Sequence, residues 1–321
     1  MAFHVMGTGS AQPGKTVTND DLSQFLDTDD EWIVTRTGIK TRQVCTGEST
    51  SDLAEAAARR ALEDAGVLPE ELDLILCTTV SADDLTPSCA CTVQERIGAT
   101  CPAFDVNAAC AGFIFALDVA DGYFARGRVR RALVVSAEKM SRITDWTDRA
   151  TCVLFGDAAA AVVLGDEGEG PLFTKLTTCG NHAVLNAPSL HGNSPFEPTD
   201  PDAPAVAGLQ MKGREVFKFA VTSICSDVTE LAEKTGVALD DIDHFVFHQA
   251  NKRILDAAVE RLGLDRAKVA YTIDHTGNVS SACIPLTLDT LNRAGQLKPG
   301  ELVCLSGFGA GLVVGTMLLR W

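Results

Sequence analysis

The segment around Cys110 has the residue types that a nucleophilic thiol needs. Cys110 follows the small, polar stretch 105–109 and precedes the apolar run 113–117. This pattern predicts a loop that enters a buried helix, with the thiol in the first turn. Free backbone N–H groups and the positive end of the helix dipole favour a thiolate at such a position. The segment therefore predicts a nucleophilic cysteine.

Two later segments carry groups that can assist this thiol. His248 lies in the stretch 246–251, and Asn278 follows a glycine in the stretch 275–278. A cysteine, a histidine and an asparagine together suit acyl-thioester chemistry, in which the thiol holds an acyl group and hydrogen-bond donors stabilise developing negative charge. The plainer interpretation is a packed thiol, a structural imidazole and a glycine–asparagine turn.

The composition excludes several function classes. The chain has 321 residues, 46% hydrophobic and 22% charged, with a net charge of −16 that argues against nucleic acid as the main partner. Eleven cysteines, an odd number with several in apolar runs, are typical of reduced thiols in a cytoplasm. The scattered histidines predict no metal site. We see no signal-peptide pattern and no apolar run long enough for a membrane span, so we expect a cytoplasmic protein without membrane contact.

An internal repeat divides the chain. Residues 61–76 and 229–246 both show a helix, a glycine stop, an acidic turn and an apolar strand, and the two glycines are about 170 residues apart. Similar pairs recur in the same order along the chain. The repeat predicts two related halves, 1–168 with the cysteine and 169–321 with the histidine and the asparagine. The alternative is a chance similarity between two amphipathic helix–strand units.

Hydrophobic periodicity places the main elements. Residues 51–65 form an amphipathic helix that ends at Gly66. Short apolar runs predict buried strands at 73–80, 132–137, 158–164, 243–248, 301–305 and 312–319. Helices alternate with these strands, which indicates an α/β protein with its sheets covered on both faces. The proline-rich segment 183–210 is expected to be a long loop.

Six motifs in one order then resemble a known family. They are residues 30–39, the Cys110 segment, and residues 155–159, 248–251, 277–278 and 307–311. The chain resembles the β-ketoacyl-acyl-carrier-protein synthase III family of the thiolase superfamily over nearly its whole length. The resemblance implies a five-layer αβαβα fold built from two duplicated halves, and a homodimer.

The resemblance also implies a reaction, an acyl transfer that initiates fatty-acid synthesis. Cys110 takes an acyl group, acetyl or longer, from acyl-CoA, and malonyl-acyl-carrier protein then condenses with it as carbon dioxide leaves. His248, as a neutral ring, and Asn278 are implied as donors to the enolate. The backbone N–H groups of Cys110 and Ala310 are implied as the oxyanion hole. Ala310 stands where the family usually has glycine, so its φ must suit a side chain. Acyl-CoA is a substrate, and no cofactor is expected.

Binding residues follow from the same resemblance. Trp32 and Arg149 correspond to a pair that encloses the CoA adenine, and Arg36 to a contact near its phosphates. Lys218 and Arg253 correspond to a basic patch for the acidic carrier protein. An interfacial tryptophan and solvated arginines are the plainer interpretation of these residues.

One departure from the family bears on the acyl group. Thr86 stands where some relatives have phenylalanine, at a position that reaches across the dimer into the partner's acyl pocket. The smaller side chain predicts a deeper pocket and acceptance of starters longer than acetyl.

Other functions fit parts of the pattern. One is a starter-unit synthase or acyltransferase of a specialised polyketide or quinolone-type pathway, which the residues barely separate from fatty-acid initiation. A thiol hydrolase also uses Cys, His and Asn, but the local signature of that class is missing. A scaffold without activity would have no need of all three side chains.

Overall fold

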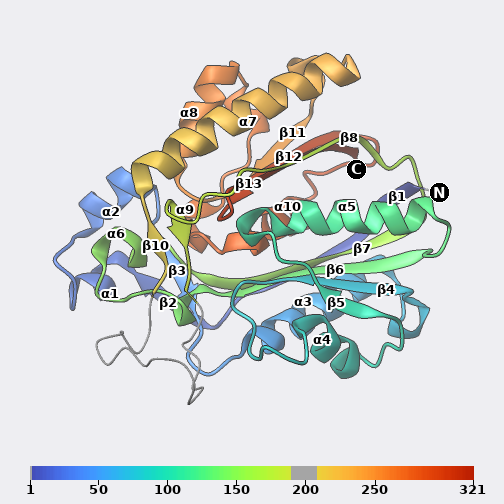
Figure 1. Cartoon of the computed structure of the whole chain (residues 1–321), viewed down its shortest axis with the longest axis horizontal. Helices are drawn as coiled ribbons and strands as arrows, with labels where there is room; N and C mark the ends of the chain where they lie inside the picture. Colours follow the sequence, from blue (N-terminus) through green and yellow to red (C-terminus); the bar gives the residue numbers. More distant parts are fainter. Residues whose placement is uncertain (1, 189–207) are drawn as a thin grey trace.

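The computed structural model describes residues 2–188 and 208–321, which form five stacked layers of helices and sheets (Figure 1). The two larger β-sheets alternate with layers of helices, and the central helices separate these sheets. This is the thiolase-like αβαβα arrangement that the family resemblance implies, and it confirms the predicted fold class.

The first sheet has the strand order β1-β7-β6-β4-β5. The pairs β1–β7 and β7–β6 are antiparallel, whereas β4 runs parallel to both β6 and β5. The strands are β1 (Ala2–Ala11), β7 (Asp157–Gly168), β6 (Arg131–Lys139), β4 (Leu74–Thr78) and β5 (Ala103–Asp105).

The second sheet repeats this arrangement with one strand fewer. Its order is β8-β13-β12-β11, antiparallel at the first two pairs and parallel at the last. The strands are β8 (Pro171–Thr178), β13 (Val313–Arg320), β12 (Leu302–Gly309) and β11 (His244–Phe247). We propose that the chain divides between β7 and β8 into the halves 1–168 and 169–321, and the matching strand orders support this division.

The longer helices complete the layers (Figure 1). The central layer holds α5 and α10, α7 and α8 cover the second sheet, and α3 and α4 cover the first. Their bounds are α3 (Thr50–Ala65), α4 (Cys89–Ile97), α5 (Gly112–Ala125), α7 (Gly213–Thr235), α8 (Lys252–Leu262) and α10 (Cys283–Arg293).

The remaining elements are shorter. They are β2 (Lys15–Thr18), α1 (Asn19–Ser23), α2 (Asp30–Thr37), β3 (Thr41–Val44), α6 (Arg149–Cys152), β9 (Leu185–Asn186), β10 (Gln210–Met211) and α9 (Ile273–Thr276). Two small sheets pair β2 with β3 and β9 with β10. Single 3₁₀ turns are η1 (Pro69–Glu71), η2 (Ala109–Ala111), η3 (Met140–Arg142), η4 (Leu239–Asp241), η5 (Arg266–Lys268) and η6 (Ser280–Ala282).

The strands read as continuous apolar runs because both faces of each sheet are covered. In β4, Leu74 and Leu76 pack against the central helices, whereas Ile75 and Cys77 pack against α3 and α4. Alternate side chains of a strand point to opposite faces, so a strand buried on both sides has no polar face.

Glycines let β1 approach α3 closely. A Cβ at Gly9 would lie 2.3 Å from the backbone nitrogen of Ala61, and one at Gly7 would lie 2.5 Å from that of Ala65. The facing side of α3 is built from alanines, which also leave little side chain between the two backbones. Both ends of this helix are capped. Ser49 and Asp52 form a capping box at its start, and Gly66 ends it in a left-handed conformation.

The predicted helix and strands occur within a few residues of their expected bounds. The apolar runs do not predict β1, which contains the small residues 7–11 in succession, or β8, which lies half exposed at a sheet edge. The short strands β2, β3 and β5 were not predicted either. The segment 183–210 was expected to be a loop, but β9 and β10 pair near its two ends. Its residues 189–207 lie outside the described part of the chain.

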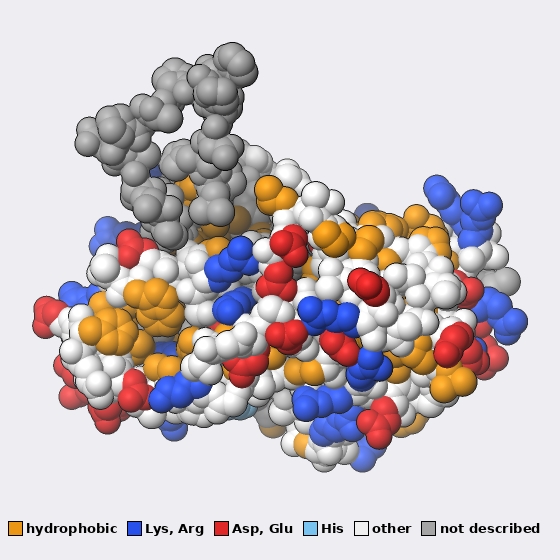
Figure 2. Space-filling model, turned by 90° about the horizontal axis from the view of Figure 1, so that it is seen from below, with side chains coloured by type: hydrophobic (Ala, Val, Ile, Leu, Met, Phe, Trp, Pro, Cys, Tyr) orange, Lys and Arg blue, Asp and Glu red, His pale blue; other side chains and the backbone are white. Residues whose placement is uncertain are grey.

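The face in Figure 2 carries acidic and basic side chains side by side, so it shows no single-sign field. All eleven cysteines lie in the described ranges and are free thiols. Within residues 2–188 and 208–321, we find neither a helix that is long and apolar enough to cross a membrane nor a metal-binding group of His, Cys, Asp and Glu.

The close contact between β1 and α3 gives a stability prediction. Gly9→Ala should lower the free energy of unfolding by about 2 kcal/mol or more, because backbone atoms of α3 cannot yield to the new Cβ. Gly14→Ala is the matched control, since a Cβ there would meet no atom within 4 Å. Denaturant unfolding of the three proteins measures the difference. Equal stabilities would contradict this account of the contact.

Candidate active site

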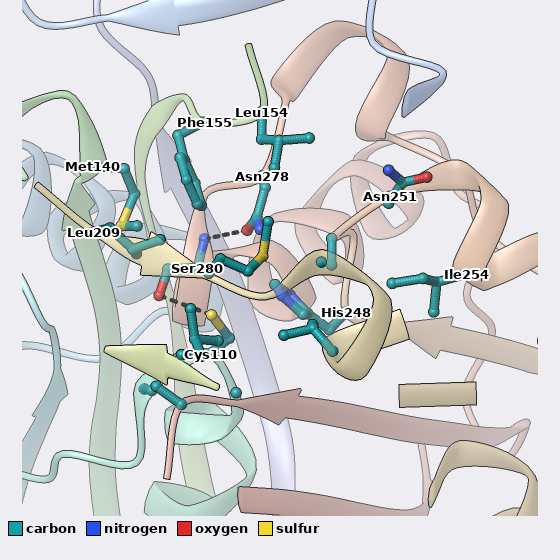
Figure 3. Close-up of a pocket in the computed structure, with 18 of the residues that line it drawn as sticks. Cys110, Met140, Leu154, Phe155, Leu209, His248, Asn251, Ile254, Asn278 and Ser280 are labelled. Atoms are coloured by element: carbon teal, nitrogen blue, oxygen red, sulfur yellow. Dashed lines mark hydrogen bonds between the residues drawn. The ribbon is translucent and has the colours of Figure 1, made fainter. Parts of the chain in front are cut away.

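One cavity of about 360 Å³ brings together residues from both halves of the chain. Cys110, His248, Asn278 and Ala310 all line it. In Figure 3, the Cys110 sulfur lies below Ser280, with the His248 ring on one side and Asn278 above. The four residues that the family resemblance assigns to the chemistry therefore share one site.

Cys110 lies in η2, the turn that leads into α5. The preceding residue, Ala109, has a φ of 45°, in the left-handed region that residues with a side chain seldom adopt. Ser280 begins the corresponding turn η6 before α10 and has a φ of 50°. These two turns pack against each other, and the Cys110 thiol donates a hydrogen bond of 3.4 Å to Ser280 Oγ.

The resting thiol is neutral, contrary to the thiolate expected at a helix start. Burial raises the pKa of Cys110 to about 12, the Ser280 hydroxyl opposes the rise, and the Glu138 carboxylate adds to it. The helix α5 begins at Gly112, so Cys110 precedes its first turn rather than lying in it. Loss of water around the sulfur therefore outweighs the helix dipole.

His248 follows β11, and its backbone N–H continues the parallel pairing by donating to Ser306 O at 2.9 Å. Only 1% of the residue is exposed, and its ring meets the edge of Phe308 with 5.2 Å between centroids. Burial lowers the pKa of His248 to about 3. The ring is neutral at physiological pH, as expected, and its Nδ1 has no hydrogen-bond partner among the described residues.

Asn278 is oriented by its own turn. Its backbone N–H donates to Leu154 O at 2.8 Å, and its carbonyl accepts from Gly156 N at 3.1 Å. The side-chain Oδ1 accepts from the backbone N–H of Ser280 at 2.9 Å. Because an N–H must face an oxygen, this bond sets the orientation of the amide and leaves its NH₂ group as the donor for a ligand.

The end of β12 packs directly against Cys110. A Cβ at Gly309 would lie 2.6 Å from the backbone nitrogen of Cys110, so only glycine allows this approach. Ala310 comes next and also lines the cavity. Among the described non-glycine residues, positive φ values occur only at Ala109 and Ser280, so the backbone of Ala310 accommodates its side chain.

The cavity mouth carries the proposed nucleotide-binding residues. Trp32 and Arg36 line it, and the guanidinium groups of Arg36 and Arg149 lie 4.8 and 4.9 Å from the centre of the Trp32 ring. Arg149 also pairs with Asp27 at 3.4 Å. The three side chains form one stacked cluster.

Three other predicted residues lie outside the cavity. Lys218 on α7 and Arg253 on α8 are exposed, and each adjoins a lining residue, Phe217 and Ile254 respectively. Thr86 lies in an exposed loop, so within one chain it does not contribute to the cavity. Its assignment to a partner's acyl pocket stays a prediction.

The sequence reasoning missed the wall of the cavity. That wall is apolar and includes Met140, Ile143, Leu154, Phe155, Leu209 and Phe308. These residues come from separate loops and strand ends and show no common periodicity. Ser280 was missed too, although the resemblance between residues 107–111 and 278–282 was a signal for it.

The chain matches known proteins over its whole length. Residues 104–180 match the family model described as 3-oxoacyl-[acyl-carrier-protein (ACP)] synthase III, and residues 232–321 match the model of its C-terminal part. The β-ketoacyl-[acyl-carrier-protein] synthase III of Clostridium acetobutylicum is 47% identical over 323 residues, which cover 100% of this chain and 99% of that protein.

Solved structures agree with these matches. The crystal structure of 3-oxoacyl-[acyl-carrier-protein] synthase III from Aquifex aeolicus superimposes with a TM-score of 0.92 at 40% identity, covering 100% of both chains. The priming β-ketosynthase from the R1128 polyketide biosynthetic pathway superimposes with a TM-score of 0.90 at 37% identity, covering 99% of this chain and 96% of that one.

The fold and these relatives define a thiolase-like condensing enzyme, an acyltransferase. Within that class, the identity over the full length places the chain in the 3-oxoacyl-[acyl-carrier-protein] synthase III family, to which it belongs.

The buried imidazole gives a pH prediction. The folded protein keeps His248 neutral down to about pH 3, whereas the unfolded chain protonates it near 6.5. The unfolded state therefore binds the extra proton as pH falls below 6.5, and stability falls with it. Between pH 7.5 and 5, wild-type should lose about 2 kcal/mol more unfolding free energy than His248→Gln. Denaturant unfolding at both pH values measures this, and parallel losses would contradict a neutral buried ring.

Proposed function

We propose that this enzyme condenses an acyl-CoA starter with malonyl-acyl-carrier protein through an acyl group on Cys110, and so initiates fatty-acid synthesis. The observation that carries the proposal is the single cavity shared by Cys110, His248 and Asn278. The names of the relatives, synthases acting with an acyl carrier protein, support it.

In the first stage, the Cys110 sulfur attacks the carbonyl carbon of the acyl-CoA. The sulfur–carbon bond to CoA breaks, and CoA leaves as a thiol with the proton that Cys110 gives up. In the tetrahedral intermediate between these two events, the carbonyl oxygen carries a negative charge, which the backbone N–H groups of Cys110 and Ala310 stabilise. The close approach of β12 at Gly309 supports this pairing.

In the second stage, the malonyl thioester replaces CoA in the same cavity. Its carbon–carboxylate bond breaks, carbon dioxide leaves, and the electron pair forms an enolate whose oxygen accepts hydrogen bonds from His248 and the Asn278 amide. The enolate carbon then attacks the acyl carbonyl, and the Cys110 thiolate is released. Both donors are neutral and buried, so the site strengthens their hydrogen bonds without providing a full positive charge.

The cavity mouth and the surface beside it suit CoA and the acyl carrier protein. Trp32, Arg36 and Arg149 offer an aromatic face and guanidinium planes to an adenine and its phosphates. Lys218 and Arg253, exposed beside the cavity, offer positive charge to an acidic carrier protein. No cofactor takes part, because acyl-CoA is itself a substrate. We propose a homodimer that works in the cytoplasm, in line with the free thiols.

The R1128 priming β-ketosynthase keeps a second function open. Its likeness to this chain favours, as an alternative, the priming of a specialised polyketide with the same chemistry. The starter and the pathway would differ, and the roles of the residues would stay the same.

Acylation by acyl-CoA tests the proposal. Wild-type should gain one acyl group at Cys110, seen by peptide mass spectrometry, and release carbon dioxide from malonyl-acyl-carrier protein during condensation. Cys110→Ser should lose most of the acylation rate. His248→Ala and Asn278→Ala should still be acylated but condense about 10²–10³-fold more slowly. Acylation of another cysteine, or equal loss of both stages in these variants, would contradict the assigned roles.

Chain length tests the role of Thr86. If this residue lines the partner's acyl pocket, Thr86→Phe should slow turnover of starters longer than acetyl while acetyl-CoA turnover changes little, because the larger ring shortens the pocket. Steady-state rates with a series of acyl-CoAs measure this. Equal effects on all chain lengths, or strict acetyl preference in wild-type, would refute it.

A further inference from the structure

We propose that Ser280 is a further catalytic residue, whose hydroxyl donates a hydrogen bond to the Cys110 sulfur as it becomes a thiolate during acylation. This inference rests on the proposed function, because it concerns the step in which Cys110 takes the acyl group. It also concerns the reactivity of the free thiol, which can be measured without any substrate.

The geometry places the hydroxyl directly at the sulfur. Ser280 Oγ lies 3.4 Å from Cys110 Sγ, and Figure 3 shows the two atoms facing each other at the cavity. The same serine donates its backbone N–H to Asn278 Oδ1 at 2.9 Å. One buried residue therefore contacts the nucleophile through its side chain and the enolate donor through its backbone.

The turn itself does not need this hydroxyl. Ala109 occupies the corresponding place in the first half of the chain and adopts nearly the same φ, 45° against 50°, with only a methyl group. The positive φ at position 280 therefore gives no reason for a serine in place of an alanine. The hydroxyl at position 280 faces the Cys110 sulfur and also the buried Glu138 carboxylate, which indicates a role among these groups rather than in the turn.

The other groups around the sulfur make such a donor necessary. Glu138 on β6 acts on Cys110 as a negative charge, Cys283 on α10 is a buried thiol beside it, and His248 is neutral. Within residues 2–188 and 208–321, Ser280 is the one side chain that hydrogen-bonds to this sulfur. A thiolate forming here faces the Ser280 hydroxyl and the backbone N–H of Cys110 itself, with no cation among the groups named above, so the hydroxyl is the one side-chain donor that stabilises it.

The enzyme and acyl-CoA supply every group that acylation needs. In the resting enzyme, the thiol proton points to Ser280 Oγ. As the sulfur attacks the acyl carbonyl, that proton leaves with the CoA thiol, and the Ser280 O–H rotates to donate to the sulfur. When condensation later releases the thiolate, the same donor stabilises it until the sulfur takes up a proton from water and the resting thiol is restored. Ser280 itself forms no covalent bond.

Alkylation of the free enzyme by iodoacetamide tests this directly, with Cys110 followed by peptide mass spectrometry between pH 7 and 10. Ser280→Ala should slow alkylation at Cys110 about tenfold at each pH, because a hydrogen bond to a charged group is lost. Acylation by acyl-CoA should slow in parallel. Ser280→Gly also lacks the hydroxyl but relieves the left-handed backbone, so it should show the same slowing as Ser280→Ala.

Ser281→Ala is the matched control, because this neighbouring buried serine donates to Glu138 at 2.7 Å and makes no contact with the sulfur. It should alkylate like wild-type. Wild-type rates in Ser280→Ala, recovery in Ser280→Gly, or equal slowing in Ser281→Ala would overturn the assignment in favour of a purely structural turn. The predicted alkylation pattern with no acylation of wild-type by any acyl-CoA would support Ser280 and contradict the proposed function.

Discussion

The active site depends on the contact between two equivalent turns from the two halves of the chain. Cys110 belongs to η2 and Asn278 adjoins η6, and each turn contains a residue with positive φ. Such conformations cost free energy and persist only where the surrounding structure fixes them. Here both turns lead into central helices, α5 and α10, which are buried between two sheets. The five-layer fold is therefore what holds the thiol and the carboxamide in one cavity.

Loss of water determines the chemistry of that cavity. The thiol and the imidazole are both neutral in the resting protein, because burial disfavours the charged form of each. A site of neutral donors suits a reaction in which negative charge appears briefly, first on a carbonyl oxygen and then on an enolate. In the reaction that we propose, the apolar wall around Met140, Phe155 and Phe308 would keep water away from both intermediates.

The sequence predicted those parts of the protein that local patterns encode. Apolar runs located most of the buried strands, and the repeated glycine stops indicated the halves. The motifs around Cys110, His248 and Asn278 identified residues that the structure brings into one cavity. The expected thiolate was wrong for the resting protein, since a local pattern at Cys110 shows a helix start but not the burial of the sulfur by distant segments.

Other features depend on contacts that no single segment carries. The cavity wall comes from loops far apart in the chain, so its residues share no spacing. The role of Gly309 depends on the backbone of Cys110, and that of Ser280 on its sulfur. Thr86 lies away from the cavity in a single chain, so its assignment needs a second copy.

A crystal structure of the protein after reaction with an acyl-CoA starter, in the absence of malonyl-acyl-carrier protein, would test the central claim most directly. The account predicts an acyl group on Cys110 Sγ, its chain against the apolar wall, and its carbonyl oxygen between the backbone nitrogens of Cys110 and Ala310. His248 and Asn278 would then remain free to face the incoming thioester. An acyl oxygen bound instead by His248 and Asn278, or an acyl group on a different cysteine, would contradict it.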